Sequence, residues 1–200
     1  LSRSRITRED VTAHNGLTTV VWQQELDGVP LYKTITQANL TRDGQIITMG
    51  SHFMADPQAA SRLEAAPRAQ LLAQPPIDLA KAVSLAAAHL GDPVAAAEVR
   101  TASAAEGAER KTKIAVSGLS DTVAQLSWLP MSADALRLTW DVTLMSLAQG
   151  EMFRVLVDAQ TGEVLVRTSL TNDISNATYR VYADPATFLP PDSPAPQTPG

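Results

Sequence analysis

The sequence contains no cysteine and no long apolar run. Without cysteine, the 200-residue chain has neither a disulfide framework nor a thiolate for catalysis or metal binding. No stretch reaches the roughly 18 consecutive apolar residues of a membrane-spanning helix, so we expect no membrane span. The hydrophobic share of 44% is that of a globular protein that can bury a core.

Clustered positive charge is also scarce, and the formal net charge is −5. Nucleic-acid binding relies on gathered Lys and Arg side chains that neutralise phosphates. The densest basic groups of the sequence are Arg3, Arg5 and Arg8 at the start and Arg110, Lys111 and Lys113 in the middle. Both groups are sparse, so we expect no nucleic-acid partner.

Catalytic motifs are missing as well. The sequence has no His-Glu-x-x-His zinc motif, no Gly-x-Ser-x-Gly elbow and no phosphate-binding glycine loop. The three histidines, His14, His52 and His89, lie far apart, so we expect no metal site in these residues. Asp141 and Asp158 are candidates for paired carboxylates. A strand position with an outward side chain explains Asp141 better, and a turn hydrogen bond explains Asp158 better.

The clearest pattern in the chain is a β-hairpin at residues 153–167. Two apolar arms, Phe153–Val157 and Val164–Arg167, flank a polar turn in which Gly162 is expected to adopt a positive φ. Residues 136–147 alternate in the same way and precede the hairpin. Together they predict an antiparallel meander.

A second meander is predicted near the start of the chain. Residues 17–26, 31–40 and 45–49 form three strand-like runs. The first turn contains Gly28 and is followed by Pro30, which interrupts pairing. The second turn is of the Asp-Gly kind, at Asp43 and Gly44.

Helices are predicted between the two meanders. Asp56 and Pro57 begin a helix that Pro67 ends, and Asp78 caps a second helix over residues 79–90 that stops at Gly91. Residues 93–113 are rich in Ala, Glu and Ser and favour a partly helical, exposed connection, and residues 123–129 start the second sheet.

The predicted fold class is therefore α+β, with two small subdomains. Residues 1–55 form the first sheet, 56–76 a helical connection and 77–170 the second subdomain. Residues 171–200 form a junction and an extended tail, because the end of the chain is rich in proline and has no periodic apolar pattern.

Two stretches resemble known families. Residues 17–53 resemble the fungalysin/thermolysin propeptide (FTP) domain, through the run Gln-Gln-x-x-Asp-Gly-Val-Pro-Leu-Tyr at 23–32, Asp-Gly-Gln-Ile-Ile at 43–47 and Gly-Ser-His-Phe at 50–53. Residues 77–167 resemble a PepSY domain, through an Ala-rich helix, strands and the run RVLVDAQTGEVL at 154–165. The run ATYRVY at 177–182 is similar to the propeptide–catalytic junction of fungalysin-type metallopeptidases.

The resemblance implies a proregion of a secreted zinc metallopeptidase. Each half would be a small cystatin-like sheet packed on a helix. The chain would assist folding of its partner, the cognate catalytic domain, and would inhibit it until proteolysis. The zinc cofactor would belong to that catalytic domain, whose zinc motif has no counterpart here, and a signal peptide would precede this sequence. We expect processing near Ser175, Asn176, Ala177 and Thr178, because exposed segments of small polar residues are readily cleaved.

Two other classes of function stay open at this stage. The chain could be a stand-alone inhibitor or binding module that acts in trans on another protease. It could also be a sheet-and-helix domain that binds a small ligand on a concave face. Fold alone does not separate these alternatives from a proregion.

Overall fold

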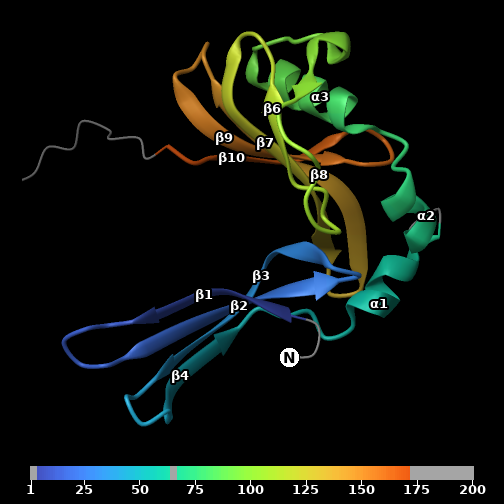
Figure 1. Cartoon of the computed structure of the whole chain (residues 1–200). Coiled ribbons are helices and arrows are strands. Elements are labelled where there is room, and N and C mark those ends of the chain that lie inside the picture. Colours follow the sequence, from blue (N-terminus) through green and yellow to red (C-terminus); the bar gives the residue numbers. More distant parts are fainter. Residues whose placement is uncertain (1–3, 64–66, 172–200) are drawn as a thin grey trace, which may run out of the picture.

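The computed structural model describes residues 4–63 and 67–171, and its arrangement is shown in Figure 1. The strands are β1 (Ser4–Val11), β2 (Thr18–Leu26), β3 (Val29–Leu40), β4 (Ile46–Ser51), β5 (Arg100–Thr101), β6 (Thr112–Ala115), β7 (Leu119–Ser132), β8 (Ala135–Ser146), β9 (Glu151–Asp158) and β10 (Val164–Ser169). The helices are α1 (Pro57–Ala60), α2 (Arg68–Ala73) and α3 (Leu79–Leu90), with short 3₁₀ turns η1 (Ser61–Leu63) and η2 (Ala96–Glu98).

The protein is α+β, and its ten strands form one mixed sheet. The main path runs β1-β2-β3-β7-β8-β9-β10, with β4 paired to β3 and the short β5–β6 ladder paired to β7. Both expected meanders are present, but β3 pairs in parallel with β7 through Leu31 and Trp128, which joins them. We call β1–β4 the arm and α3 with β5–β10 the body; α1 and α2 run along one side between them (Figure 1).

The helices lie against the body. Helix α3 contacts β8, β9 and β10, and α1 contacts β8. All six residues of β4 are exposed. A strand covered by a helix would instead have buried residues on one face. The expected helix behind each meander is therefore found for the body, whereas the arm is a largely solvated sheet. The proposed boundaries between subdomains stay predictions.

The ends of α3 follow the sequence signals. The side chain of Asp78 accepts a hydrogen bond from the backbone N–H of Lys81, at 2.8 Å. Gly91 takes a left-handed conformation with φ 91° and satisfies the last carbonyls of the helix. Asp56 caps α1 in the same way, but that helix is shorter than expected and continues as η1.

The main core lies between α3 and the inner face of β7–β9. Its buried side chains include Trp128, Trp140 and Phe153. Three residues of the arm, Leu26, Val29 and Leu31, belong to the same core. The arm and the body are therefore joined by apolar packing as well as by the strand pair.

Several elements differ from the sequence-based expectation. Residues 93–113 were expected to be partly helical and exposed, but they contain η2, β5 and β6, and β6 extends the body sheet. Strand β1 was not expected; it pairs with β2 through its backbone, and seven of its eight residues are exposed. Neither segment has the apolar alternation that marks a half-buried strand.

Candidate functional site at the junction of arm and body

The expected processing residues Ser175, Asn176, Ala177 and Thr178 lie outside the described residues. Within residues 4–63 and 67–171, there is no group of three or more His, Cys, Asp or Glu side chains that could hold a metal ion. No helix of that part is long and apolar enough to cross a membrane.

Strand β3 changes partner at a bulge. Glu25 pairs with Pro30, but the next residue of β2 to pair, Gln23, pairs with Ile35. Pairing with β2 thus stops directly after Pro30, as the sequence predicted, and the residues between turn outward to meet the body. A bulge re-aims the strand and its side chains, and here it lets β3 pair first with β7 and then again with β2.

The side chain of Gln23 holds this bulge in place. Its amide nitrogen donates to the carbonyl oxygens of Leu31, at 2.6 Å, and Thr34, at 2.9 Å. The hydroxyl of Thr34 also donates to Leu31 O, at 3.0 Å. These bonds replace the ladder bonds lost at the bulge, because buried backbone groups need partners. Gln23 opens the FTP-like run, so this part of the motif has a local structural reason.

The neighbouring residues of the run fix the rest of the turn. Asp27 and Gly28 both have positive φ, 54° and 79°, as a tight hairpin turn of the right twist requires. The side-chain amide of Gln24 donates to Met54 O and accepts from Met54 N, each at 2.8 Å. The run therefore ties the β2–β3 turn to the segment that leaves the arm.

The body meets the bulge with buried polar contacts. The indole Nε1 of Trp128 donates to Leu26 O at 3.3 Å, and Ser127 Oγ donates to Pro30 O at 3.2 Å. Trp128 and Leu31 are both fully buried. The junction is consequently a closed interface in which the indole packs and also satisfies a carbonyl of the arm.

An aromatic ring and two cations lie at the edge of this interface. The Arg154 guanidinium carbon lies 4.9 Å from the Tyr32 ring centroid, and Lys33 Nζ lies 5.3 Å from it. Arg154 also binds Asp141 through Nε, at 2.8 and 3.1 Å to the two oxygens, and through Nη2. That hydrogen bond is the largest cause that raises the pKa of Arg154.

Asp141 corrects one expectation. Its side chain was expected to point outward from the strand, but it is buried and paired with Arg154. The period-two pattern cannot reveal this, because the partner lies on the next strand, β9. Asp158 behaves as expected: its Oδ1 accepts from the backbone N–H groups of Gln160, at 2.7 Å, and Thr161, at 2.9 Å. Asp158 also pairs with Arg137, at 2.7 Å.

The turn after Asp158 is confirmed in detail. Gly162 has φ 79°, the left-handed conformation that the sequence predicted. Its N–H donates to Asp158 O at 2.9 Å, and the N–H of Asp158 donates to Glu163 O at 2.8 Å. The hairpin packs under α3, because a side chain at Gly162 would meet Leu85 at 2.9 Å.

A pocket of about 530 Å³ opens beside Tyr32, and we call it the junction pocket. It is lined by Arg5, Thr7, Gln23, Pro30, Leu31, Tyr32, Lys33, Ile35, His52, Gln125, Ser127 and Arg154. Residues of the arm and of the body both contribute. No sequence pattern marks this site, because its residues come from five strands and from the segment after β4.

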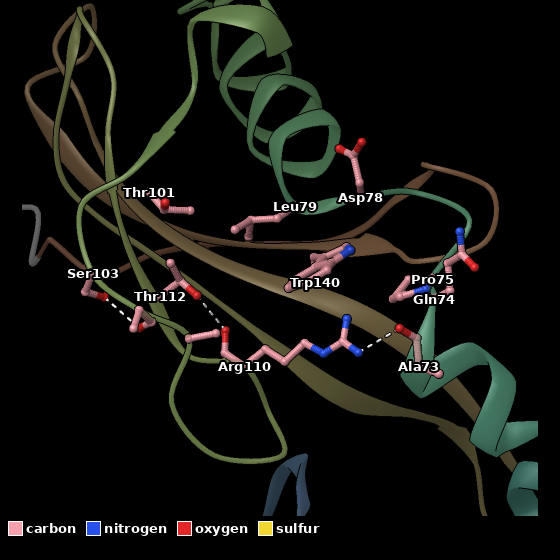
Figure 2. A pocket seen from close by; sticks show the side chains of 12 residues that line it. Ala73, Gln74, Pro75, Asp78, Leu79, Thr101, Ser103, Arg110, Thr112 and Trp140 are labelled. Atoms are coloured by element: carbon pink, nitrogen blue, oxygen red, sulfur yellow. Dashed lines mark hydrogen bonds between the residues drawn. The ribbon is translucent and has the colours of Figure 1, made fainter.

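A second pocket, of about 400 Å³, lies between α2, the start of α3 and the β5–β6 loop (Figure 2). Its floor is Trp140, whose Nε1 donates to Ile77 O at 2.7 Å. Figure 2 shows Arg110 extended across it to Ala73 O, at 2.8 Å. Asp78, at its rim, caps α3. The two charged residues of this pocket, Arg110 and Asp78, are thus used within the fold, which leaves the junction pocket as the better candidate for binding.

Residues 4–53 match the family model described as the Fungalysin/Thermolysin Propeptide Motif, FTP. This segment is therefore similar to the FTP motif. The match covers the arm from the first residue of β1 to just beyond β4, including the whole β2–β3 turn and the bulge. The expected FTP resemblance is thereby confirmed, and the match begins earlier than the residues that suggested it.

A curated relative extends the similarity beyond the arm. The chain is 27% identical over 182 residues to "Extracellular metalloproteinase mep" of Aspergillus terreus. The aligned region covers 89% of this chain and 26% of the relative, so the chain spans about a quarter of that protein's length.

A solved structure also shows partial likeness. It is the Bacillus megaterium YpeB C-terminal domain, with a TM-score of 0.40, 12% identity and coverage of 85% of this chain and 57% of that chain. Similarity at that level does not decide the topology of the body. The PepSY resemblance of residues 77–167 stays a resemblance in the sequence.

Proposed function

We propose that this chain is the propeptide of a secreted, fungalysin-type zinc metallopeptidase. In this role it assists folding of the catalytic domain and inhibits it until proteolysis. The observation that carries the proposal is the FTP match over residues 4–53, which coincides with the arm. The alignment with a metalloproteinase over 89% of the chain supports the same role for arm and body together.

The surface of the arm supports a partner. Strand β4 exposes Ile46, Ile47 and Met49, with 63%, 54% and 56% of each residue accessible. Exposed apolar groups that lie together mark interaction sites more often than chance placement does. They lie within the matched FTP segment. We propose that the catalytic domain covers this strand in the precursor.

A propeptide acts while it is joined to its enzyme. A tethered inhibitor works at an effective concentration in the millimolar range, so modest intrinsic affinity is enough. Cleavage of the tether removes that advantage. We propose that the cleaved bond lies near Ser175–Thr178, and N-terminal sequencing of the mature enzyme tests this. A mature start upstream of Thr171 or well beyond Pro190 would contradict the placement.

The zinc ion belongs to the proposed catalytic domain, where it would activate a water molecule for peptide hydrolysis. The described part of this chain offers no ligand group for it. The propeptide contributes surface and not catalysis, so the purified chain is expected neither to hydrolyse peptides nor to bind zinc stoichiometrically.

The proposal is tested by refolding the cognate catalytic domain with and without this chain as a separate polypeptide. We expect a higher yield of folded enzyme with the chain present, and inhibition that disappears after the chain is digested. Equal yield and full activity in its presence would overturn the proposal. Equal yield with potent inhibition would instead indicate an inhibitor that acts in trans, the alternative from the sequence.

A further inference from the structure

The junction pocket is basic in an otherwise acidic protein. Among its lining residues are two arginines, a lysine and a histidine, namely Arg5, Arg154, Lys33 and His52. No Asp or Glu lines it. The whole chain has a net charge of −5, so this concentration of positive groups is opposite in sign to the protein as a whole.

Two of the cations are already neutralised within the fold. Arg154 forms a bidentate ion pair with Asp141. Arg5 lies 3.1 Å from a carboxylate oxygen of Glu25 and 3.5 Å from one of Glu109. Lys33 has neither an ion pair nor a hydrogen bond to its ammonium group among the described residues; its contact is the face of Tyr32. One positive charge in the pocket is therefore uncompensated.

The backbone at Lys33 is held in a costly conformation. Its φ is 56°, in the left-handed region where a residue other than glycine costs about 1–2 kcal/mol. Lys33 lies in the bulge, and the hydrogen bonds of Gln23 and Thr34 to Leu31 O stabilise this conformation. Glycine would adopt it without that cost. A lysine here presents a charge to the pocket at the expense of stability, and such strain is characteristic of functional positions.

Further donors face the same space. Arg154 Nη1 and the side-chain amide of Gln125 have no hydrogen-bond partner within the described part of the chain, and both residues line the pocket. An anion in the pocket could accept from these groups and from Lys33. Charge-assisted hydrogen bonds of this kind are about twice as strong as neutral ones. One uncompensated charge suits a carboxylate better than a doubly charged phosphate.

We propose that the junction pocket binds a single carboxylate, with Lys33 supplying the charge and Arg154 and Gln125 the orienting donors. Resting on the proposed function, the carboxylate is an Asp or Glu side chain of the cognate catalytic domain. The pocket is then an electrostatic contact between propeptide and enzyme, at the point where arm meets body. It adds specificity to the apolar contact of β4.

The first experiment uses this chain alone. N-acetyl-glutamate N-methylamide is titrated into the isotope-labelled chain, and the side-chain N–H resonances of Gln125 and Arg154 are followed by NMR. We expect saturable shifts with millimolar affinity, and at least a fivefold loss of affinity with Lys33→Gln. N-acetyl-glutamine N-methylamide, the neutral isostere, should leave the resonances unchanged. Equal shifts with both compounds, or none with the acid, would overturn the proposal whatever the protein's role.

The second experiment tests whether the catalytic domain supplies the carboxylate. Lys33→Gln should weaken inhibition of the catalytic domain about tenfold and flatten its salt dependence. Lys81→Gln removes the same charge from the exposed face of α3 and should change neither. Lys33→Gly should weaken inhibition equally while the melting temperature stays level or rises, which excludes misfolding as the cause. If all three variants inhibit like the unaltered chain, the catalytic domain is not the source of the carboxylate and that assignment fails. If even the unaltered chain does not inhibit, the inhibitory part of the proposed function fails, whereas the NMR result stands by itself.

Discussion

The arm and the body use the same antiparallel meander but bury it to different extents. In the body, α3 covers the sheet, and Val142, Leu144 and Val155 are fully buried. In the arm, β4 is exposed throughout, and its apolar residues Ile46, Ile47 and Met49 are all exposed. The apolar groups of the arm that are best buried, Leu26, Val29 and Leu31, lie in the core of the body.

This difference shows where the stability of the arm comes from. Burial of apolar surface contributes about 25 cal/mol per Å². The arm gains most of it at the junction, since β4 gains little. A sheet that is anchored at one end and bare at the other is well suited to meet a partner, because the folded shape exists before binding and less ordering is needed.

The largest expected effect is at the junction itself. Trp128→Ala should lower the free energy of unfolding by about 3–5 kcal/mol, because it removes a fully buried ring and leaves Leu26 O without its donor. Trp22→Ala, which truncates a half-buried ring in the arm, should cost about 1–2 kcal/mol. Chemical denaturation measures both. Equal losses would remove the distinction between junction and arm.

Trp128→Ala also tests whether the two regions fold as one unit. Because arm and body share a core, we expect them to unfold together, in one denaturation transition that is the same for every spectroscopic probe. Two resolved transitions, with the arm lost first, would instead support the proposed division into subdomains.

The sequence predicted what depends on local pattern. The strands of both meanders, the Asp78 and Gly91 caps of α3 and the left-handed Gly162 follow from alternation, capping and turn chemistry. The junction pocket could not be predicted, because the contact of Tyr32 with Arg154 joins residues far apart in sequence. The bulge depends on Gln23. Its role could not be predicted, because it requires the positions of the carbonyl groups to which Gln23 donates. Strand β1 has charged residues on both faces and so gives no periodic signal.

Two glycines compare the junction with the tip of the arm. Gly28 and Gly44 both have φ 79° in hairpin turns of β3. An alanine at Gly44 meets nothing within 4 Å, so Gly44→Ala should cost only the conformational term, about 1 kcal/mol. At Gly28 the added methyl would lie 2.8 Å from Ala108 Cβ, so Gly28→Ala should cost about 1–3 kcal/mol more. Thermal melts of the two variants measure this difference. Equal midpoints would refute close packing at the junction.

Matched substitutions on two strands compare binding with stability. Val155→Thr places a hydroxyl in the closed core of the body and should cost about 1–3 kcal/mol. Ile47→Thr on the exposed β4 should change stability by less than about 0.5 kcal/mol. It should, however, weaken inhibition of the catalytic domain. An Ile47→Thr protein that inhibits normally would show that β4 is not a docking surface.

The smallest effect concerns pH at the edge where β1 meets the body. Burial is the largest influence on Glu25 and raises its pKa from 4.5, Arg5 lowers it, and Glu109 raises it again. Glu25 Oε1 lies 3.1 Å from Arg5 but accepts no well-aligned hydrogen bond, so this pairing offsets only part of the burial cost. The folded state therefore holds the proton of Glu25 more tightly than the unfolded chain does.

The sign of the pH effect follows from this. The contribution of protonated Glu25 is fully present below pH 4.5 and is lost as the pH rises through the raised pKa, because the folded state binds more protons in that window. Glu25→Gln should consequently be as stable as the unaltered chain at pH 4 and slightly more stable at pH 7, by less than about 0.5 kcal/mol. Denaturation curves at the two pH values, with exposed Glu163→Gln as the control, measure it. A variant that is less stable at pH 7 would show that the ion pair with Arg5 outweighs burial, and that charge helps to hold β1 against β2.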